Sequence, residues 1–341
     1  MTKIASFELY QFQIDLTVPL PVAKQRIDHR IGIIVNVTLD DNQQYFAEIS
    51  PLAGIDIEGL PLTGFSHETL AQVSTELIQL QSQLIGQEIT ELALAAERSL
   101  LPSVQFGLSV LAAKCLQQFP VRVITQANIP LLYQGLSTTV IDQKLADLSH
   151  IHSVKIKVAQ TDMDSEIAFV HQVLARKPSL TLRLDANRGF TLNQAVDFLA
   201  CLPKKQIEYV EEPCQQPSDN LKMYQQLGIK YALDEFLLTA DLDFDKLLQQ
   251  QPGIGAFILK PMLLGSLSKM QEIVSLADHQ GVRCILSSSL ESDVGIADLA
   301  LISQALTPDN PPGLDTLSAF SQRLLDENGQ LKLNKLKLIK G

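Results

Sequence analysis

Three carboxylates and two lysines occupy positions in this chain where they could do chemistry together. Asp185, Glu211, Asp234, Lys157 and Lys260 each lie at the end of a short apolar run. Carboxylates that converge on one spot repel one another unless a divalent cation neutralises them. Because neither His nor Cys belongs to the set, its hard oxygen ligands favour Mg²⁺ over Zn²⁺. The residue types therefore predict one Mg²⁺ held by the three carboxylates.

The lysines follow a pattern that suits proton transfer. Residues 154–158 read Val-Lys-Ile-Lys-Val, so a strand would place Lys155 and Lys157 on one face and the aliphatic side chains on the other. We expect the two ammonium groups to enter a partly desolvated cavity and to depress each other's pKa, so that one lysine can act as a general base. Lys260 would place a second cation across the cavity. A base, an opposing cation and Mg²⁺ predict removal of a proton next to a substrate carboxylate.

A regular series of short strands is needed to position these residues. Beyond about residue 125, apolar β-rich runs alternate with stretches long enough for a helix, such as residues 163–176, 191–201 and 266–279. The runs cover residues 153–158, 180–184, 207–210, 230–233, 256–259 and 282–286. Strand–helix alternation predicts a parallel sheet. The polar residue at the end of each run, Ser288 after the last of them, predicts the active face of a (β/α) barrel.

The first part of the chain has a different pattern. Residues 1–50 alternate apolar and polar side chains and predict antiparallel strands. A helix is expected to open at residues 66–69, and residues 92–116 are rich in Ala and Leu at helical spacing. Strands followed by helices indicate an α+β unit. Near the end of the chain, residues 331–336 predict a strand that rejoins this first domain.

The composition excludes several classes of protein. The chain has 341 residues, 46 % of them apolar, and a net charge of −11. It can bury a large core, and its acidity makes nucleic acid a poor candidate partner. No run of 18 apolar residues and no leader peptide are apparent, and the four cysteines are scattered, which is typical of free thiols in a reducing compartment. We expect a cytoplasmic protein that binds neither membrane nor nucleic acid.

Around these positions the chain carries the motifs of a known enzyme family. They are Lys155-Ile156-Lys157, Leu182-Arg183-Leu184-Asp185-Ala186-Asn187-Arg188, Val210-Glu211-Glu212-Pro213-Cys214, Leu233-Asp234-Glu235, Leu259-Lys260-Pro261, Gly265-Ser266-Leu267, Ser287-Ser288-Ser289-Leu290-Glu291-Ser292, Pro312-Gly313-Leu314-Asp315-Thr316 and Glu48-Ile49-Ser50-Pro51-Leu52. On them the chain resembles the muconate-lactonizing branch of the enolase superfamily, and within it most closely the dehydratases that form o-succinylbenzoate. Sites of this superfamily combine a Lys or His base with Mg²⁺.

The resemblance implies a fold and a domain organisation. The expected fold class is a modified (β/α)7β barrel with an α+β N-terminal capping domain. Residues 1–124 would form the capping domain and residues 125–310 the catalytic barrel. Residues 311–341 would be a C-terminal segment that returns to the capping domain.

The resemblance also implies a reaction and a role for each site residue. The reaction is dehydration of 2-succinyl-6-hydroxy-2,4-cyclohexadiene-1-carboxylate to o-succinylbenzoate, in menaquinone biosynthesis. Lys157 would abstract the proton α to the ring carboxylate, and Lys260 would stabilise the enediolate from the opposite face. The other implied roles are metal binding by Asp185, Glu211 and Asp234, tuning of Lys157 by Lys155, support of the metal site by Arg183 and Asn187, and substrate contact by Ser288.

Two other functions are compatible with the same residues. A racemase or epimerase of N-acylamino acids or dipeptides needs the same two lysines and the same metal, because it also begins with removal of an α-proton. A barrel that binds an acidic metabolite without catalysis is disfavoured, since it would not need converging charges.

The chain also departs from the family pattern at Ala47, where Gly is common, and at Phe236, where Ser is common. Neither position touches the expected chemistry, although Phe236 could reshape the pocket wall.

Overall fold

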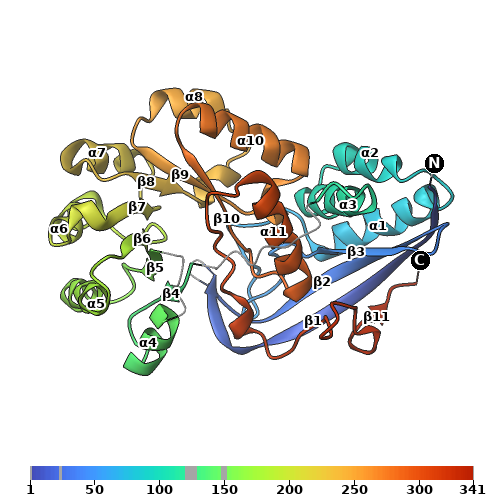
Figure 1. The fold of residues 1–341 in the computed structure, drawn as a ribbon, viewed down its shortest axis with the longest axis horizontal. Helices are drawn as coiled ribbons and strands as arrows, with labels where there is room; N and C mark the ends of the chain where they lie inside the picture. The colour runs from blue at the N-terminus through green and yellow to red at the C-terminus, as the bar shows by residue number, and fades with distance from the viewer. Residues whose placement is uncertain (1, 23–24, 120–128, 147–151, 341) are drawn as a thin grey trace.

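Two sheets organise the molecule, as the computed structural model shows for residues 2–22, 25–119, 129–146 and 152–340 (Figure 1). A four-stranded sheet with antiparallel pairing has the order β11-β1-β2-β3. A seven-stranded parallel sheet has the order β10-β9-β8-β7-β6-β5-β4. Neighbours in the parallel sheet are consecutive in the chain, which is the topology of a (β/α) barrel.

The antiparallel sheet and three helices form the capping domain. Its elements are β1 (Ile4–Val22), β2 (Gln25–Leu39), β3 (Gln44–Ile49), α1 (Leu70–Leu84), α2 (Thr90–Arg98), α3 (Pro102–Cys115) and, from the end of the chain, β11 (Lys337–Leu338). Helix α1 begins where Thr69 and Gln72 form a capping box. The helical pattern over residues 92–116 is split in two, because Pro102 has no N–H to continue a helix and instead opens α3.

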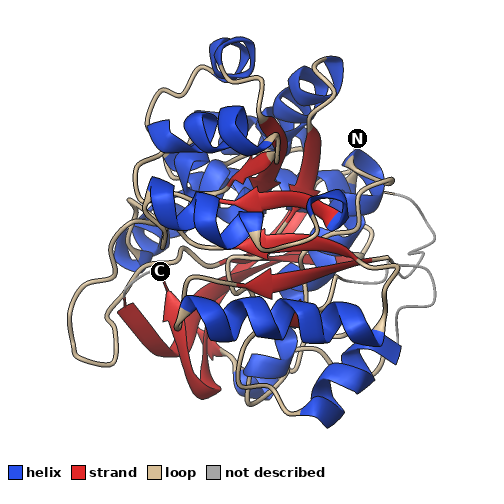
Figure 2. Cartoon of the chain, turned by 90° about the vertical axis from the view of Figure 1, so that its left-hand side faces the viewer, coloured by secondary structure: helices blue, strands red, loops and turns tan. Residues whose placement is uncertain are grey.

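The parallel sheet carries its helices on the outside, so that helices surround its strands in Figure 2. Its strands are β4 (Leu131–Leu132), β5 (Ser153–Lys157), β6 (Thr181–Asp185), β7 (Ile207–Glu211), β8 (Tyr231–Leu233), β9 (Ile254–Leu259) and β10 (Arg283–Leu286). Its helices are α4 (Thr138–Ala146), α5 (Met163–Arg176), α6 (Leu192–Ala200), α7 (Ser218–Leu227), α8 (Phe244–Gln250), α9 (Pro261–Leu264), α10 (Leu267–His279) and α11 (Asp293–Leu306). Short 3₁₀ helices lie at η1 (Lys204–Gln206), η2 (Glu235–Leu238), η3 (Leu317–Ala319) and η4 (Leu333–Lys335).

An irregular segment closes the barrel between β10 and β4. The Gly313 amide donates to the Leu286 carbonyl at 2.8 Å, and the Ile129 amide donates to the Pro312 carbonyl at 3.3 Å. Pro311 and Pro312 cannot donate to a ladder themselves, which explains why this position does not form a regular strand.

Capping domain and barrel share an apolar core. Phe12 of β1 and Ile34 of β2 pack in one cluster with Leu263 of α9, Val294 of α11 and Phe320 of the C-terminal segment. All five side chains are buried. The capping sheet is therefore packed directly against the loops at the carboxyl end of the barrel strands.

The predicted fold class is confirmed, and each of the six predicted strands lies within two residues of an observed one. Two details of the prediction are wrong or incomplete. The strand expected at residues 331–336 is absent there; the segment forms η4, and the two-residue strand β11 follows it and pairs with β1. Strand β4 was missed because two residues are too short to show a pattern. The predicted boundary between residues 124 and 125 lies outside the described residues.

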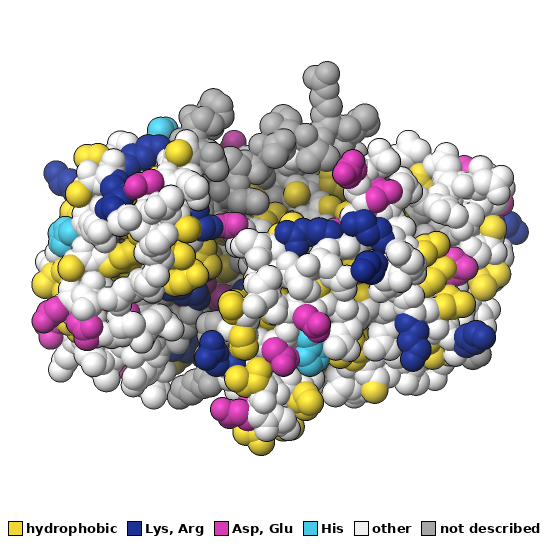
Figure 3. Space-filling view, turned by 90° about the horizontal axis from the view of Figure 1, so that it is seen from below, with side chains coloured by type: hydrophobic (Ala, Val, Ile, Leu, Met, Phe, Trp, Pro, Cys, Tyr) yellow, Lys and Arg dark blue, Asp and Glu magenta, His cyan; other side chains and the backbone are white. Residues whose placement is uncertain are grey.

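On the face drawn in Figure 3, acidic and basic side chains both occur in small groups. Basic side chains there are interspersed with acidic and apolar ones. Within the described ranges, no helix is both long enough and apolar enough to cross a membrane.

Candidate active site

The three carboxylates lie on neighbouring strands at the carboxyl end of the barrel. Asp185 is the last residue of β6, Glu211 is the last residue of β7, and Asp234 follows β8 directly. Asp185 and Glu211 are partners in the ladder between β6 and β7. All three side chains are buried. Because carboxyl ends of parallel strands meet at one edge, the barrel concentrates three buried acids at its mouth.

The lysines reach these acids from two sides. The Nζ of Lys155, on β5, donates to Asp185 Oδ2 at 2.8 Å and to Glu211 Oε2 at 2.7 Å. The Nζ of Lys157 lies 2.7 Å from Asp185 Oδ2. From the other side, Lys260 follows β9 and donates to Asp234 Oδ2 at 2.5 Å. The structure thus places an ammonium group at either end of the row of carboxylates.

The lysines and acids perturb each other's pKa values. Burial alone would raise the pKa of Asp185, but Lys155 and Lys157 hold it well below its usual range. Burial and the neighbouring Asp185 raise the pKa of Glu211 to about 8. The cluster therefore holds one acid that stays ionised and one whose ionisation is costly, which is the pattern that an added cation would relieve.

The expectation of a lowered lysine pKa is wrong for Lys155. Burial lowers the pKa of Lys155, but the attraction of Asp185 and Glu211 outweighs it, so this pKa lies well above its ordinary value. The pKa of Lys260 is likewise raised, since Asp234 outweighs its burial. The expectation considered only repulsion between ammonium groups; ion pairing with carboxylates is the larger effect.

The donor set fits a hard divalent cation by its chemistry. Three buried carboxylates supply oxygen ligands of the kind that Mg²⁺ prefers. As they stand, their oxygens face ammonium groups, and no group of three or more His, Cys, Asp or Glu side chains in the described part of the chain is spaced to hold a metal ion. Beside them, one oxygen of Glu235 is buried without a hydrogen-bond partner. Binding a cation would thus exchange lysine contacts for metal contacts.

Asn187 and Ser288 also lie at this end of the barrel. The side chain of Asn187 accepts a hydrogen bond from Lys157 and donates one to Glu235 Oε1 at 3.2 Å. Ser288 Oγ accepts from the Leu290 amide at 3.0 Å and lies 3.0 Å from Thr316 Oγ1. Asn187 is therefore in direct contact with the expected base.

Two acidic residues of the site were not assigned a role from the sequence. Glu212 is buried and accepts from the amides of Asp234 at 3.1 Å and Phe236 at 2.9 Å, and also from Arg188 Nε at 2.9 Å. Glu235 contacts Asn187 as described. The signal available was adjacency: each directly follows a proposed metal ligand in Glu211-Glu212 and Asp234-Glu235.

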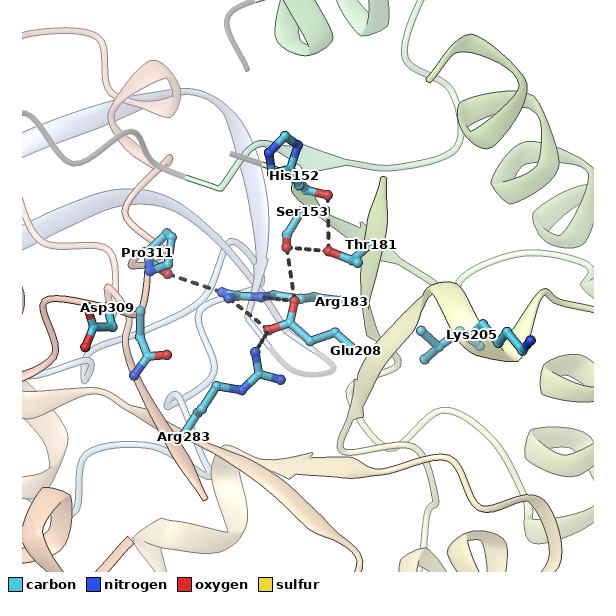
Figure 4. A pocket seen from close by; sticks show the side chains of 11 residues that line it. His152, Ser153, Thr181, Arg183, Lys205, Glu208, Arg283, Asp309 and Pro311 are labelled. Atoms are coloured by element: carbon cyan, nitrogen blue, oxygen red, sulfur yellow. Dashed lines mark hydrogen bonds and ion pairs between the residues drawn. The ribbon is translucent and has the colours of Figure 1, made fainter. Parts of the chain in front are cut away.

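Within the described residues, no hydrogen bond or ion pair joins Arg183 to Asp185, Glu211 or Asp234. Its Nη2 lies 3.0 Å from Glu208 Oε1, and its Nη1 donates to the Pro311 carbonyl at 3.2 Å. Arg283 also pairs with Glu208, at 2.5 Å, and Ser153 donates to it at 3.1 Å. These residues line a pocket of about 330 Å³ at the amino ends of the strands, where both arginines point toward Glu208 (Figure 4). Arg183 thus belongs to the floor of the barrel.

We expect Glu208→Gln to destabilise the protein by about 3 kcal/mol, because it leaves buried Arg183 without its ionic partner. The control is Asp142→Asn, which breaks the exposed ion pair with Arg176 and should cost less than about 1 kcal/mol. Urea unfolding of both variants measures the difference. Equal stabilities for the two variants would show that the floor cluster contributes no more than a surface pair.

Comparison with known proteins agrees with this architecture. Residues 141–334 match the family described as "Enolase C-terminal domain-like", and residues 4–116 match "MenC, N-terminal domain". The chain is 33 % identical to o-succinylbenzoate synthase of Proteus mirabilis over 93 % of this chain and 92 % of that protein. The chain belongs to the o-succinylbenzoate synthase family of the enolase superfamily. A second member, from Pasteurella multocida, is 30 % identical over 95 % and 93 % of the two chains.

Solved structures show the same fold at lower identity. A dipeptide epimerase from Enterococcus faecalis, complexed with Mg and L-Leu-L-Tyr, superposes with a TM-score of 0.76 at 20 % identity, covering 99 % of this chain and 97 % of that one. The o-succinylbenzoate synthase of Thermosynechococcus elongatus, with Mg in its active site, gives a TM-score of 0.69 at 23 % identity, with 93 % and 95 % covered. Synthases and epimerases thus share this scaffold, and structures of both hold Mg.

Proposed function

We propose that the chain dehydrates 2-succinyl-6-hydroxy-2,4-cyclohexadiene-1-carboxylate to o-succinylbenzoate, as a step of menaquinone biosynthesis. Membership of the synthase family supports this substrate. The observation that carries the chemistry is the placement of Lys157 and Lys260 at the two ends of a row of buried carboxylates. A carbon acid bound between them would meet an amine on either face.

Asp185, Glu211 and Asp234 would hold one Mg²⁺. When bound, the ion would supply positive charge to the carboxylate of the substrate and so acidify the neighbouring C–H bond. The burial of all three ligands suits this role, because an interior of low dielectric strengthens the effect of a charge. Glu212 would keep Asp234 in place by accepting a hydrogen bond from the backbone amide of Asp234.

The lysines would divide the reaction between them. Lys157, as the free amine, would take the proton from the ring carbon that bears the carboxylate. The electron pair of that C–H bond would form the new ring double bond as the neighbouring C–O bond breaks, and the proton would leave with the hydroxyl as water. As the proton leaves, negative charge would develop on the substrate carboxylate, as in an enediolate, and Lys260 would stabilise this charge from the opposite face. The aromatic ring of the product makes the elimination favourable.

The remaining site residues would act in support. Lys155 would tune Lys157 through the carboxylate of Asp185 that they share. Asn187 would orient the ammonium group of Lys157, and Ser288 would contact the substrate. Arg183 would support the metal site from the barrel floor, not by direct contact with the carboxylates.

The test is an assay of the purified protein with Mg²⁺ and the cyclohexadiene substrate, in which the aromatic product is followed by its absorbance. We expect formation of o-succinylbenzoate, and no formation after chelation of divalent ions. The same preparation should be offered N-acylamino acids and dipeptides of one configuration. Loss of optical purity of these compounds without any aromatic product would replace the proposal by a racemase or epimerase, and inactivity toward all of them would favour a binding protein.

We also propose that the protein acts in the cytoplasm on a small carboxylate, without nucleic acid or membrane as partner. Its cysteines are free thiols, and Cys115, Cys214 and Cys284 are buried, as is typical of proteins in a reducing compartment. We further propose that residues 1–124 form the capping domain, residues 125–310 the catalytic barrel, and residues 311–341 the segment that returns to the capping domain.

A further inference from the structure

A carboxylate of the capping domain caps a helix of the barrel. Glu48 lies next to the end of β3 and is buried. Its carboxylate accepts from the Ser292 amide at 3.1 Å, from Ser292 Oγ at 2.5 Å and from the Gly295 amide at 2.9 Å. Ser292 is the N-cap residue of α11 and Gly295 lies in its first turn, where backbone N–H groups lack helical partners and attract negative charge. Ser50 Oγ donates to the same carboxylate at 2.6 Å.

The helix is built to admit this carboxylate. A Cβ added to Gly295 would lie 2.9 Å from Glu48 Oε2 and 2.6 Å from Glu291 Cβ. Any residue larger than glycine would therefore push Glu48 away from the end of α11. The close approach and the hydrogen bonds are two separate signs that the contact between the domains is specific.

An arginine of the capping domain holds the loop that precedes α11. Arg30 of β2 is buried, and its guanidinium donates to the Ser50 carbonyl at 2.8 Å and to the Leu290 carbonyl at 3.0 Å. Leu290 has a positive φ of 66°, a conformation that leucine rarely adopts without outside support. Its amide donates to Ser288 Oγ. Arg30 thus holds Leu290, and the amide of Leu290 in turn holds the hydroxyl group of Ser288.

We propose that Glu48 and Arg30 are positioning residues, which hold the Ser287–Ser292 loop in the shape that presents Ser288 to the substrate. The inference rests on the proposed function, in which Ser288 contacts the substrate. Neither residue is placed in contact with the reacting atoms; they act through the loop. The capping domain therefore influences substrate affinity by holding the Ser287–Ser292 loop, in addition to any direct contacts it makes with the substrate.

The test compares two carboxylates at the same helix end. Glu48→Gln removes an acceptor from the first turn of α11. Asp293→Asn alters a carboxylate of the same turn, which instead accepts from the amides of Leu324 and Leu325 at 2.8 and 2.9 Å, away from the loop. We expect Glu48→Gln to raise KM about tenfold with kcat within about threefold. Asp293→Asn should leave KM and kcat within about twofold of wild type.

Amide hydrogen exchange gives a readout that does not depend on activity. Exchange over residues 287–292 should accelerate in Glu48→Gln and stay unchanged in Asp293→Asn. Arg30→Lys, which keeps the charge but cannot reach all of the carbonyls, should have the same effects and replaces Glu48→Gln if that variant does not fold. Equal KM values and equal exchange in the Glu48 and Asp293 variants would overturn the inference. A wild-type protein that forms no aromatic product would refute the proposed function instead, and the exchange experiment would still decide on the loop.

Discussion

Lys157→Ala and Lys157→Arg should both lower turnover by about 10²- to 10⁴-fold, the usual contribution of a general base. Alanine removes the amine. Arginine keeps a positive charge opposite Asp185, but its guanidinium does not lose its proton in proteins and so cannot accept one from carbon. The pair of variants therefore separates proton transfer from ion pairing. Steady-state kinetics with the cyclohexadiene substrate measures turnover, and circular dichroism checks that the barrel is folded.

Lys222→Ala is the matched control for these variants. Lys222 is exposed on α7 and pairs with Asp219 at 2.7 Å, so its loss should leave turnover within about twofold of wild type. Near-normal turnover in Lys157→Arg would show that the position needs only a charge, and the base would have to be sought elsewhere in the site.

Asp234→Asn should weaken Mg²⁺ binding by at least about tenfold, since even the outer-shell partners of a metal cause losses of that size. The amide keeps the shape of the side chain but removes the negative charge that Mg²⁺ needs from its ligands. The backbone at this position should stay in place, because Glu212 holds the amide of residue 234. Calorimetric titration with Mg²⁺ measures the affinity without any substrate.

Asp243→Asn provides the same chemical change outside the site. Asp243 caps α8, where it accepts from the Lys246 amide, and it is exposed. Its substitution should leave Mg²⁺ affinity unchanged. An Asp234→Asn variant that binds Mg²⁺ as tightly as wild type would remove Asp234 from the set of ligands.

The barrel could be predicted because its strands are short, apolar and regularly spaced. In a parallel sheet covered on its outer face, each strand is a short run rich in apolar residues, and the polar residue that ends the run marks the active face. This is why residues 181–185 and 207–211 were found within a residue or two, together with Asp185 and Glu211 at their ends. The antiparallel capping strands showed alternation, which is equally local.

The wrong predictions concern features that periodicity does not encode. Residues 92–116 keep helical spacing across Pro102, and only the rule against proline inside a helix separates α2 from α3. Strand β4 and strand β11 have two residues each and depend on their neighbours for pairing. No pattern over so few residues distinguishes them from loops.

The sequence predicted which residues belong to the site better than it predicted the contacts between them. Strand alternation correctly sends Lys155 and Lys157 to one face, but it cannot say that Lys155 bridges two carboxylates, so the sign of its pKa shift was missed. Alternation also places Arg183 on the same face as Asp185 without telling that it reaches the floor of the barrel. Glu48 was named within a family motif, but its contact with α11 was not predicted, because Ser292 and Gly295 lie more than 240 positions away in the chain.

A crystal structure with Mg²⁺ and o-succinylbenzoate would test the central claim most directly. We predict that oxygens of Asp185, Glu211 and Asp234 surround one ion at about 2.1 Å, with the nitrogen atoms of Lys157 and Lys260 on opposite faces of the bound ring. An ion held by other residues, or both lysines on the same side of the ring, would contradict the account.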